Sequence, residues 1–155
     1  AFGFGVATEG VKQTPSRLTA RLCAEAGVAV CFGSMIGTTT AIDPSDMHAR
    51  FESLFNAGDE EGLVNLYETD AVLYPSTEGP VRGKEAIRTA LQGFIRIGGK
   101  ISIRTLATFV ANDIALTHGE WTLSGGATDL TGKSAEVLRR QPDGRWLYVI
   151  DNPWG

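Results

Sequence analysis

The feature that most constrains this chain is a series of strands that fills its second half. Residues 100–110, 114–123, 131–141 and 146–151 show the apolar and polar alternation of β-strands. The turns between them are short and contain Asn-Asp at 112–113, Gly-Gly at 125–126 and Pro-Asp-Gly at 142–144. Because turns this short join antiparallel neighbours, the sequence predicts a meander of four strands.

Three helices are predicted ahead of the meander. The first follows Ser45, its expected N-cap, and carries an apolar stripe from Met47 to Phe55. The second follows Asp59 and continues its apolar spacing as far as Tyr67, and the third covers 84–97. A short strand at 71–74 and a partner at 80–82 lie between the last two helices. This order predicts an α+β domain, with the helices gathered on one face of a curved antiparallel sheet.

Residues 1–42 differ from the rest of the chain, because neither a helical nor a strand period persists in them. We expect a poorly structured N-terminal extension there, natural translation from Met35, and one folded domain over 43–155. Cys23 and Cys31 lie far in sequence from both histidines, which is not the spacing of a zinc site. They are expected to be unreactive thiols, with a disulfide as the alternative.

Length and composition exclude several classes of protein. A chain of 155 residues is the size of one ordinary domain. No apolar run approaches the roughly 20 residues that a membrane helix needs. The net charge of −4 gives no overall attraction to a polyanion. We therefore expect a cytoplasmic protein that binds neither membranes nor nucleic acids.

The ends of two strands suggest a pocket. The strands 114–123 and 146–151 run in the same direction in a meander, so their C-terminal ends share one edge. On the first strand, the face that begins with Ile114 continues to His118; on the second, the face that begins with Leu147 ends at Asp151. Apolar walls with ionisable groups at the mouth are typical of a small-molecule site. The sequence predicts His118 and Asp151 as an acid–base pair, although Asp151 as a turn cap and His118 as a surface residue are the alternatives.

Further residues are candidates for contacts with a ligand. They are hydroxyl or amide donors, carboxylates and large rings: Tyr67, Tyr74, Glu120, Trp121, Glu136, Asn152 and Trp154. Glu120 and Glu136 would form a carboxylate pair, or would bind a cation together with Asp151. The alternatives are core packing for the tyrosines, core or interface packing for the tryptophans, a solvated strand face for the glutamates and a turn anchor for Asn152. Trp154 is expected to be a pocket lid or a dimer contact. His48 on the first helix is expected to be exposed, and no metal site or cofactor is predicted.

Three segments carry a resemblance to a known family. The entry to the third helix reads VRGKEAI at 81–87, a strand reads EWTLSG at 120–125, and the chain ends with EVLRRQPDGRWLYVIDNPWG at 136–155. Together with the order of elements, these segments resemble the nuclear transport factor 2 (NTF2)-like superfamily. Within it, the chain is most similar to small bacterial proteins known as ketosteroid isomerase homologues or SnoaL-like proteins. The resemblance covers about residues 44–155.

The resemblance implies a cone-shaped sheet closed by helices, a homodimer formed through the outer sheet face, and a pocket for a hydrophobic small molecule. Catalytic members of the superfamily use an aspartate or histidine to move a proton next to a carbonyl, without a cofactor. Other members only bind ligands or dimerise. Three hypotheses therefore remain: an isomerase, cyclase or dehydratase using Asp151 and His118; a binding protein for an apolar molecule; and a dimerising module with a filled interior.

Overall fold

The computed structural model describes residues 43–76 and 79–155. The predicted N-terminal extension, the start at Met35 and the two cysteines lie outside the described residues. The elements in chain order are η1 (Pro44–Asp46), α1 (Met47–Ala57), α2 (Glu60–Val64), β1 (Tyr67–Ser76), β2 (Gly79–Arg82), α3 (Lys84–Ile97), β3 (Lys100–Ala111), β4 (Ile114–Ser124), β5 (Leu130–Arg140) and β6 (Trp146–Asn152). None of the helices in these ranges is both long and apolar enough to cross a membrane.

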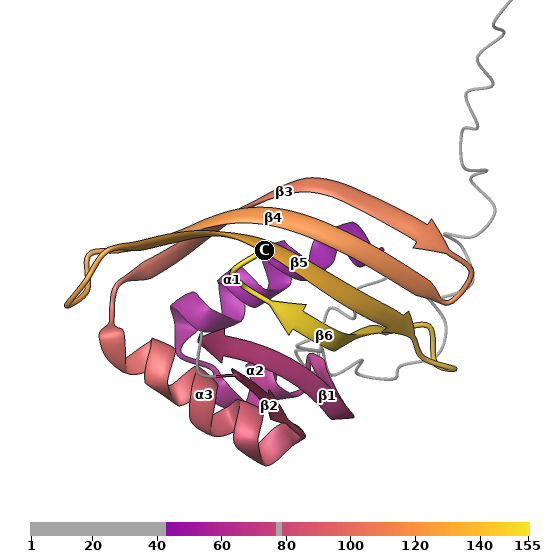
Figure 1. The fold of residues 1–155 in the computed structure, drawn as a ribbon, viewed down its shortest axis with the longest axis horizontal. Helices are drawn as coiled ribbons and strands as arrows, with labels where there is room; N and C mark the ends of the chain where they lie inside the picture. The colour runs from indigo at the N-terminus through magenta and orange to yellow at the C-terminus, as the bar shows by residue number, and fades with distance from the viewer. Residues whose placement is uncertain (1–42, 77–78) are drawn as a thin grey trace, which may run out of the picture. The chain divides into compact units, whose positions relative to one another are not determined.

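The strands form one sheet in the order β2-β1-β6-β5-β4-β3. Strands β3 to β6 are the predicted antiparallel meander, and β6 pairs in parallel with β1. The long strands β3, β4 and β5 bend over α1, while α3 lies beside β1 and β2 (Figure 1). The predicted α+β class, with a curved sheet and helices packed against it, is confirmed.

Two local predictions about the helices were wrong. Ser45 does not cap α1: the N-cap of α1 is Asp46, and Ser45 lies inside η1, whose cap Asp43 accepts hydrogen bonds at Oδ1 from the backbone N–H and the hydroxyl of Ser45, at 2.8 and 2.7 Å. Tyr67 is not helical, because α2 ends at Val64 and β1 begins at Tyr67. The backbone of Leu66 accepts a hydrogen bond from Tyr148 N–H at 2.8 Å, so pairing with β6 prevails over the helical spacing.

A bulge in β6 decides which residues face the core. Val137 on β5 pairs with Ile150, and Leu138 pairs with Tyr148, so Val149 is the extra residue. The buried residues of β6 are therefore Trp146, Tyr148 and Asp151. The predicted inner face of Leu147 and Val149 was wrong, and Asp151 reaches the core only because the bulge shifts the alternation by one residue.

A second bulge has the same effect on β3. Thr105 pairs with Gly119 and Ala107 with His118, so Leu106 is the extra residue. Ile101 and Ile103 pack against the core. Regular alternation would place Phe109 on the same face as the isoleucines, but beyond the bulge it lies on the outer face, where 61% of it is exposed.

Side chains of α1 fix this helix to the edge strand β3. Glu52 accepts a hydrogen bond from the backbone N–H of Ile103 at 2.7 Å. Asn56 both accepts from the N–H and donates to the carbonyl of Ile101, at 2.8 Å each. These bonds satisfy backbone groups that an edge strand leaves unpaired. They also set the position of α1 along the sheet, and with it the position of His48.

Candidate functional site

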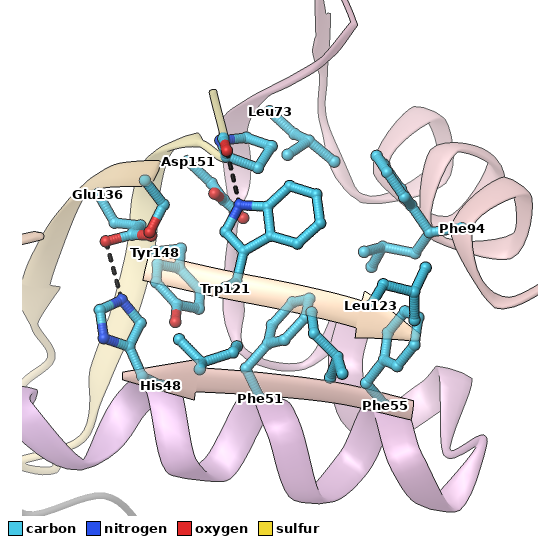
Figure 2. Close-up of a pocket in the computed structure, with 15 residues that line it drawn as sticks. His48, Phe51, Phe55, Leu73, Phe94, Trp121, Leu123, Glu136, Tyr148 and Asp151 are labelled. Atoms are coloured by element: carbon cyan, nitrogen blue, oxygen red, sulfur yellow. Dashed lines mark hydrogen bonds and ion pairs between the residues drawn. The ribbon is translucent and has the colours of Figure 1, made fainter. Parts of the chain in front are cut away.

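A cavity of about 70 Å³ lies between α1, α3 and the inner face of the sheet. Its apolar lining comes from every layer: Phe51, Phe55, Leu73, Leu91, Phe94, Ile101, Ile103, Trp121, Leu123, Tyr148 and Pro153. Four polar residues complete it: His48, Ser134, Glu136 and Asp151. The volume holds roughly five water-sized groups. In Figure 2 the acids and the histidine lie together at one end, with the phenylalanine rings toward the other.

Asp151 is the ionisable group most changed by this environment. Only 7% of the residue is exposed, and its Oδ2 accepts a hydrogen bond from the Tyr67 hydroxyl at 2.5 Å. Burial, and next the negative charge of Glu136, raise the pKa of Asp151 to about 7, while the Tyr67 hydrogen bond and His48 act in the opposite direction. A carboxyl group with this pKa exchanges a proton readily near neutral pH.

Glu136 lies directly opposite Asp151 on the neighbouring strand. It is 4% exposed, and its Oε2 accepts a hydrogen bond from the Thr117 hydroxyl at 2.7 Å. The same oxygen lies 3.0 Å from Nε2 of His48. Two buried carboxyl groups therefore face each other across one strand pair, and a histidine is bonded to one of them.

His48 is buried, with 3% of the residue exposed, so the prediction that it lies at the surface was wrong. Its Nδ1 is 2.8 Å from the Thr105 hydroxyl, and its ring lies over Gly119. A Cβ added at Gly119 would come within 3.0 Å of His48 Cε1, so this glycine makes room for the ring. The helical spacing of His48 with Phe51 and Phe55 was the sequence signal that placed it on the inner stripe.

His118 and Glu120 do not line the cavity. The inner residues of β4 are Ala115, Thr117, Gly119, Trp121 and Leu123, one position away from the predicted face. His118 is half-buried on the outer face, with its ring 6.4 Å from that of Phe109. Glu120 forms ion pairs with Arg104 at 2.6 Å and Lys133 at 3.9 Å. The pairing of His118 with Asp151 in one pocket was therefore wrong.

The structure separates the remaining carboxylates and tyrosines. Glu136 lies opposite Asp151 in the strand register, so the predicted carboxylate pair of Glu136 with Glu120 is not formed. Among the described residues, no group of three His, Cys, Asp or Glu side chains is arranged to hold a metal ion. Tyr67 is fully buried beneath Asp151, and burial, followed by the charge of Asp151, raises its pKa well above the usual value. Tyr74 is 39% exposed and lies outside the cavity lining.

The residues after β6 form a turn at the edge of the cavity. Trp121 lines the cavity and donates its indole N–H to the carbonyl of Pro153 at 2.7 Å. Trp154 packs edge-on against Trp121 and donates its indole N–H to the carbonyl of Pro75 at 3.0 Å. Asn152 accepts from Trp154 N–H and donates to the carbonyl of Gly155. Asn152 and Trp154 thus hold this turn and do not themselves line the cavity.

Sequence reasoning missed Ser134 as well as His48. Ser134 is 5% exposed on β5 and lines the cavity. It lies two residues before Glu136, so an alternating strand places both on one face. That spacing was the available signal, because Glu136 was already a candidate.

Comparisons with known proteins agree with this architecture. The family model of the SnoaL-like domain matches residues 48–149. A proposed ketosteroid isomerase from Parabacteroides distasonis has 22% sequence identity and a TM-score of 0.60, over 74% of this chain and 89% of that chain. An NTF2-like protein of unknown function from Shewanella oneidensis has 19% identity and a TM-score of 0.59, over 67% of this chain and 89% of that chain.

A proposed dehydratase of the NTF2-like family from Streptomyces avermitilis has 15% identity and a TM-score of 0.56, over 67% of this chain and 87% of that chain. No curated protein sequence matches the chain. At these identities the solved structures show a shared fold, which is that of the NTF2-like superfamily. The match over residues 48–149 shows that the chain belongs to the SnoaL-like domain family.

Proposed function

We propose that this protein is a cofactor-independent enzyme that moves a proton on a compact, largely apolar carbonyl compound, as an isomerase, cyclase or dehydratase does. One observation carries the proposal: the carboxyl group of Asp151 is buried in the wall of an apolar cavity, and its pKa is raised to about 7. A structural carboxylate gains nothing from such a site, because burying its charge costs free energy. A general base near neutral pH needs this environment.

Asp151 acts as the base. Its ionised form takes a proton from the carbon next to the carbonyl, and its acid form returns the proton to the product. The Tyr67 hydroxyl holds Oδ2, which leaves Oδ1 without a hydrogen bond from any described residue and available to the reacting carbon. The apolar lining keeps water away from the enolate that forms. Glu136, fixed by Thr117 and His48, adds the negative charge that increases the basicity of Asp151.

Deuterium exchange tests the proposal without knowledge of the natural substrate. The protein is incubated in D₂O with cyclopentanone, and loss of the proton signals next to the carbonyl is followed by NMR. We expect the wild type to accelerate exchange and Asp151→Asn to abolish the acceleration. Glu120→Gln is the matched control, because Glu120 is a carboxylate outside the cavity. Exchange that continues in Asp151→Asn would refute the base assignment.

Ketone binding, measured beside exchange in the wild type and in Asp151→Asn, separates an enzyme from a protein that only binds its ligand. Asp151→Asn retains the shape of the cavity and an acceptor for the Tyr67 hydroxyl. If the wild type binds the ketone and does not accelerate exchange, the site is a binding pocket without catalysis.

We also propose that the protein is a homodimer formed through the outer face of the sheet. A row of apolar residues crosses four paired strands, from Phe109 on β3 through Leu116 and Val137 to Ile150 on β6. Phe109, Leu116 and Ile150 are 61, 37 and 40% exposed. A contiguous apolar surface of this kind is typical of an interface. His118 lies at its border, against Phe109.

Light scattering after size-exclusion chromatography tests the dimer. Leu116→Glu places a charge in the middle of the row and is expected to give a monomer. Thr122→Glu, on an exposed position of the same strand outside the row, is the control and is expected to remain dimeric. A wild-type monomer at micromolar concentration would refute the interface.

A further inference from the structure

Ser134 has no assigned role, yet its position in the cavity is unusual. The residue is 5% exposed and belongs to the cavity lining. Each other polar group in the cavity has a side-chain partner: His48 has Thr105 and Glu136, Glu136 has Thr117, and Asp151 has Tyr67. The Ser134 hydroxyl has no hydrogen-bond partner among the described residues. Because Ser134 lines the cavity, a ligand atom placed there can accept a hydrogen bond from this hydroxyl.

The position of Ser134 is fixed by its neighbours. It lies opposite Gly119 on β4, and a Cβ added at Gly119 would be 2.9 Å from Ser134 Oγ and 3.0 Å from His48 Cε1. The hydroxyl and the imidazole therefore share the space that Gly119 leaves free. Nε2 of His48 is hydrogen-bonded to Glu136, and the imidazole makes no hydrogen bond with the Ser134 hydroxyl.

The spacing between Ser134 and Asp151 suits a carbonyl compound. Ser134 is two residues before Glu136, and Glu136 is directly opposite Asp151, so Ser134 and Asp151 are diagonal neighbours on one face. The Cα atoms of such neighbours are about 7–8 Å apart. This spacing accommodates a carbonyl group whose oxygen is hydrogen-bonded to Ser134 and whose adjacent carbon contacts Asp151.

We infer that Ser134 is the hydrogen-bond donor that binds the carbonyl oxygen of the ligand, and that it thereby directs the neighbouring carbon toward Asp151. The second half of this inference rests on the proposed function; the first half concerns binding alone. The ligand class that follows is a small ketone or aldehyde with an acceptor oxygen on one side of the acidic carbon and an apolar body toward Phe51, Phe55 and Phe94.

Two side chains then take part in the proton transfer: Asp151 accepts the proton, and Ser134 stabilises the oxygen. The C–H bond breaks, its proton goes to Oδ1 of Asp151, and its electron pair forms the carbon–carbon double bond of an enolate. The negative charge that develops on the oxygen is stabilised by the Ser134 O–H. Return of the proton from Asp151 restores the carbonyl, or completes an isomerisation when it is added to another carbon.

Infrared spectroscopy tests the hydrogen bond separately from turnover. Cyclopentanone labelled with ¹³C at the carbonyl is bound to the wild type, to Ser134→Ala and to Thr122→Ala, whose hydroxyl is on the exposed face of β4. A hydrogen bond lowers the carbonyl stretching frequency, so we expect the bound band to move to higher frequency in Ser134→Ala and to stay in place in Thr122→Ala. Exchange measured as kcat/KM should fall on the order of 100-fold in Ser134→Ala, with most of the loss in kcat.

The outcomes separate the two proposals. A band that responds to Ser134→Ala, in a wild type that does not accelerate exchange, supports the carbonyl donor and refutes the enzyme. A band that is unchanged in Ser134→Ala overturns the Ser134 inference, even if exchange depends on Asp151. A wild type that gives no bound-ketone band overturns the carbonyl assignment. Thermal unfolding of Ser134→Ala, expected close to that of the wild type, checks that the cavity is intact.

Discussion

Replacing Asp151 with asparagine is predicted to stabilise the folded protein above neutral pH, although it removes the proposed catalytic base. Asparagine has nearly the same shape, and its carbonyl accepts the hydrogen bond from Tyr67 as the carboxylate does. The variant differs from the wild type in having no ionised carboxylate at this buried position above neutral pH. Proteins often sacrifice stability at catalytic positions, and this site provides a measure of that loss.

The magnitude follows from the pKa of Asp151, which is raised from its ordinary value of 3.8 to about 7 in the folded protein. The folded state holds the proton more tightly than the unfolded state. Its contribution to stability is therefore complete below pH 3.8 and is lost as the pH rises through 7. The pKa values of the two states differ by about 3, and a difference of 1 in pKa corresponds to about 1.36 kcal/mol. The full effect on the unfolding free energy is therefore roughly 4 kcal/mol.

Urea unfolding followed by tryptophan fluorescence provides the assay, since Trp121 and Trp146 are both buried in the core. The difference in unfolding free energy between Asp151→Asn and the wild type should grow by up to about 4 kcal/mol between pH 4 and pH 8, in favour of the variant. The control Glu120→Gln should show no such growth. A constant difference across this range would show that Asp151 titrates normally, and the proposal of a base with a raised pKa would lose its foundation.

Glu136→Gln removes the negative charge next to Asp151 and keeps an acceptor for His48. The midpoint of the pH dependence of exchange should therefore fall by roughly two pH units, which is the effect of two charges about 6 Å apart at an effective dielectric constant of about 20. An unchanged midpoint in the pH–rate profile would show that Glu136 does not set the proton affinity of Asp151. Gly119→Ala forces a methyl group against the His48 ring and should cost about 1–3 kcal/mol of unfolding free energy in urea titrations. Gly93→Ala, a helix position with nothing within 4 Å, should instead add about 1 kcal/mol, and equal effects of the two changes would contradict the packing described for His48.

Much of the fold was predictable because turns and periodicity are local signals. The connections of the meander, two residues long after β3 and five residues long after β4 and β5, are short enough to favour antiparallel pairing. The third helix was predicted with the bounds that the structure shows, 84–97. Tyr67 shows the limit of such reasoning. Its spacing from Leu63 is helical, but pairing with β6, more than 80 residues away, places it in a strand.

The site was less predictable because it depends on register, and register was altered by bulges. A single extra residue reverses the faces of a strand, and nothing in the type of residue at Val149 or Leu106 marks it as the position of a bulge. The choice of His118 on β4 was one position away from the inner face. Asp151 lines the cavity although the face predicted for its strand was wrong.

The bulge at Val149 also explains how the chemistry and the core share one strand. Trp146 and Tyr148 fill the core with regular alternation, and a regular strand would then turn Ile150 inward and Asp151 outward. With the extra residue, Ile150 joins the outer apolar row and Asp151 enters the cavity opposite Glu136. The backbone irregularity therefore provides both proposed functional surfaces at once, the dimer face and the acidic end of the pocket. A change that removed the bulge would be expected to exchange a buried acid for a buried isoleucine, and so to lose the base while strengthening the core.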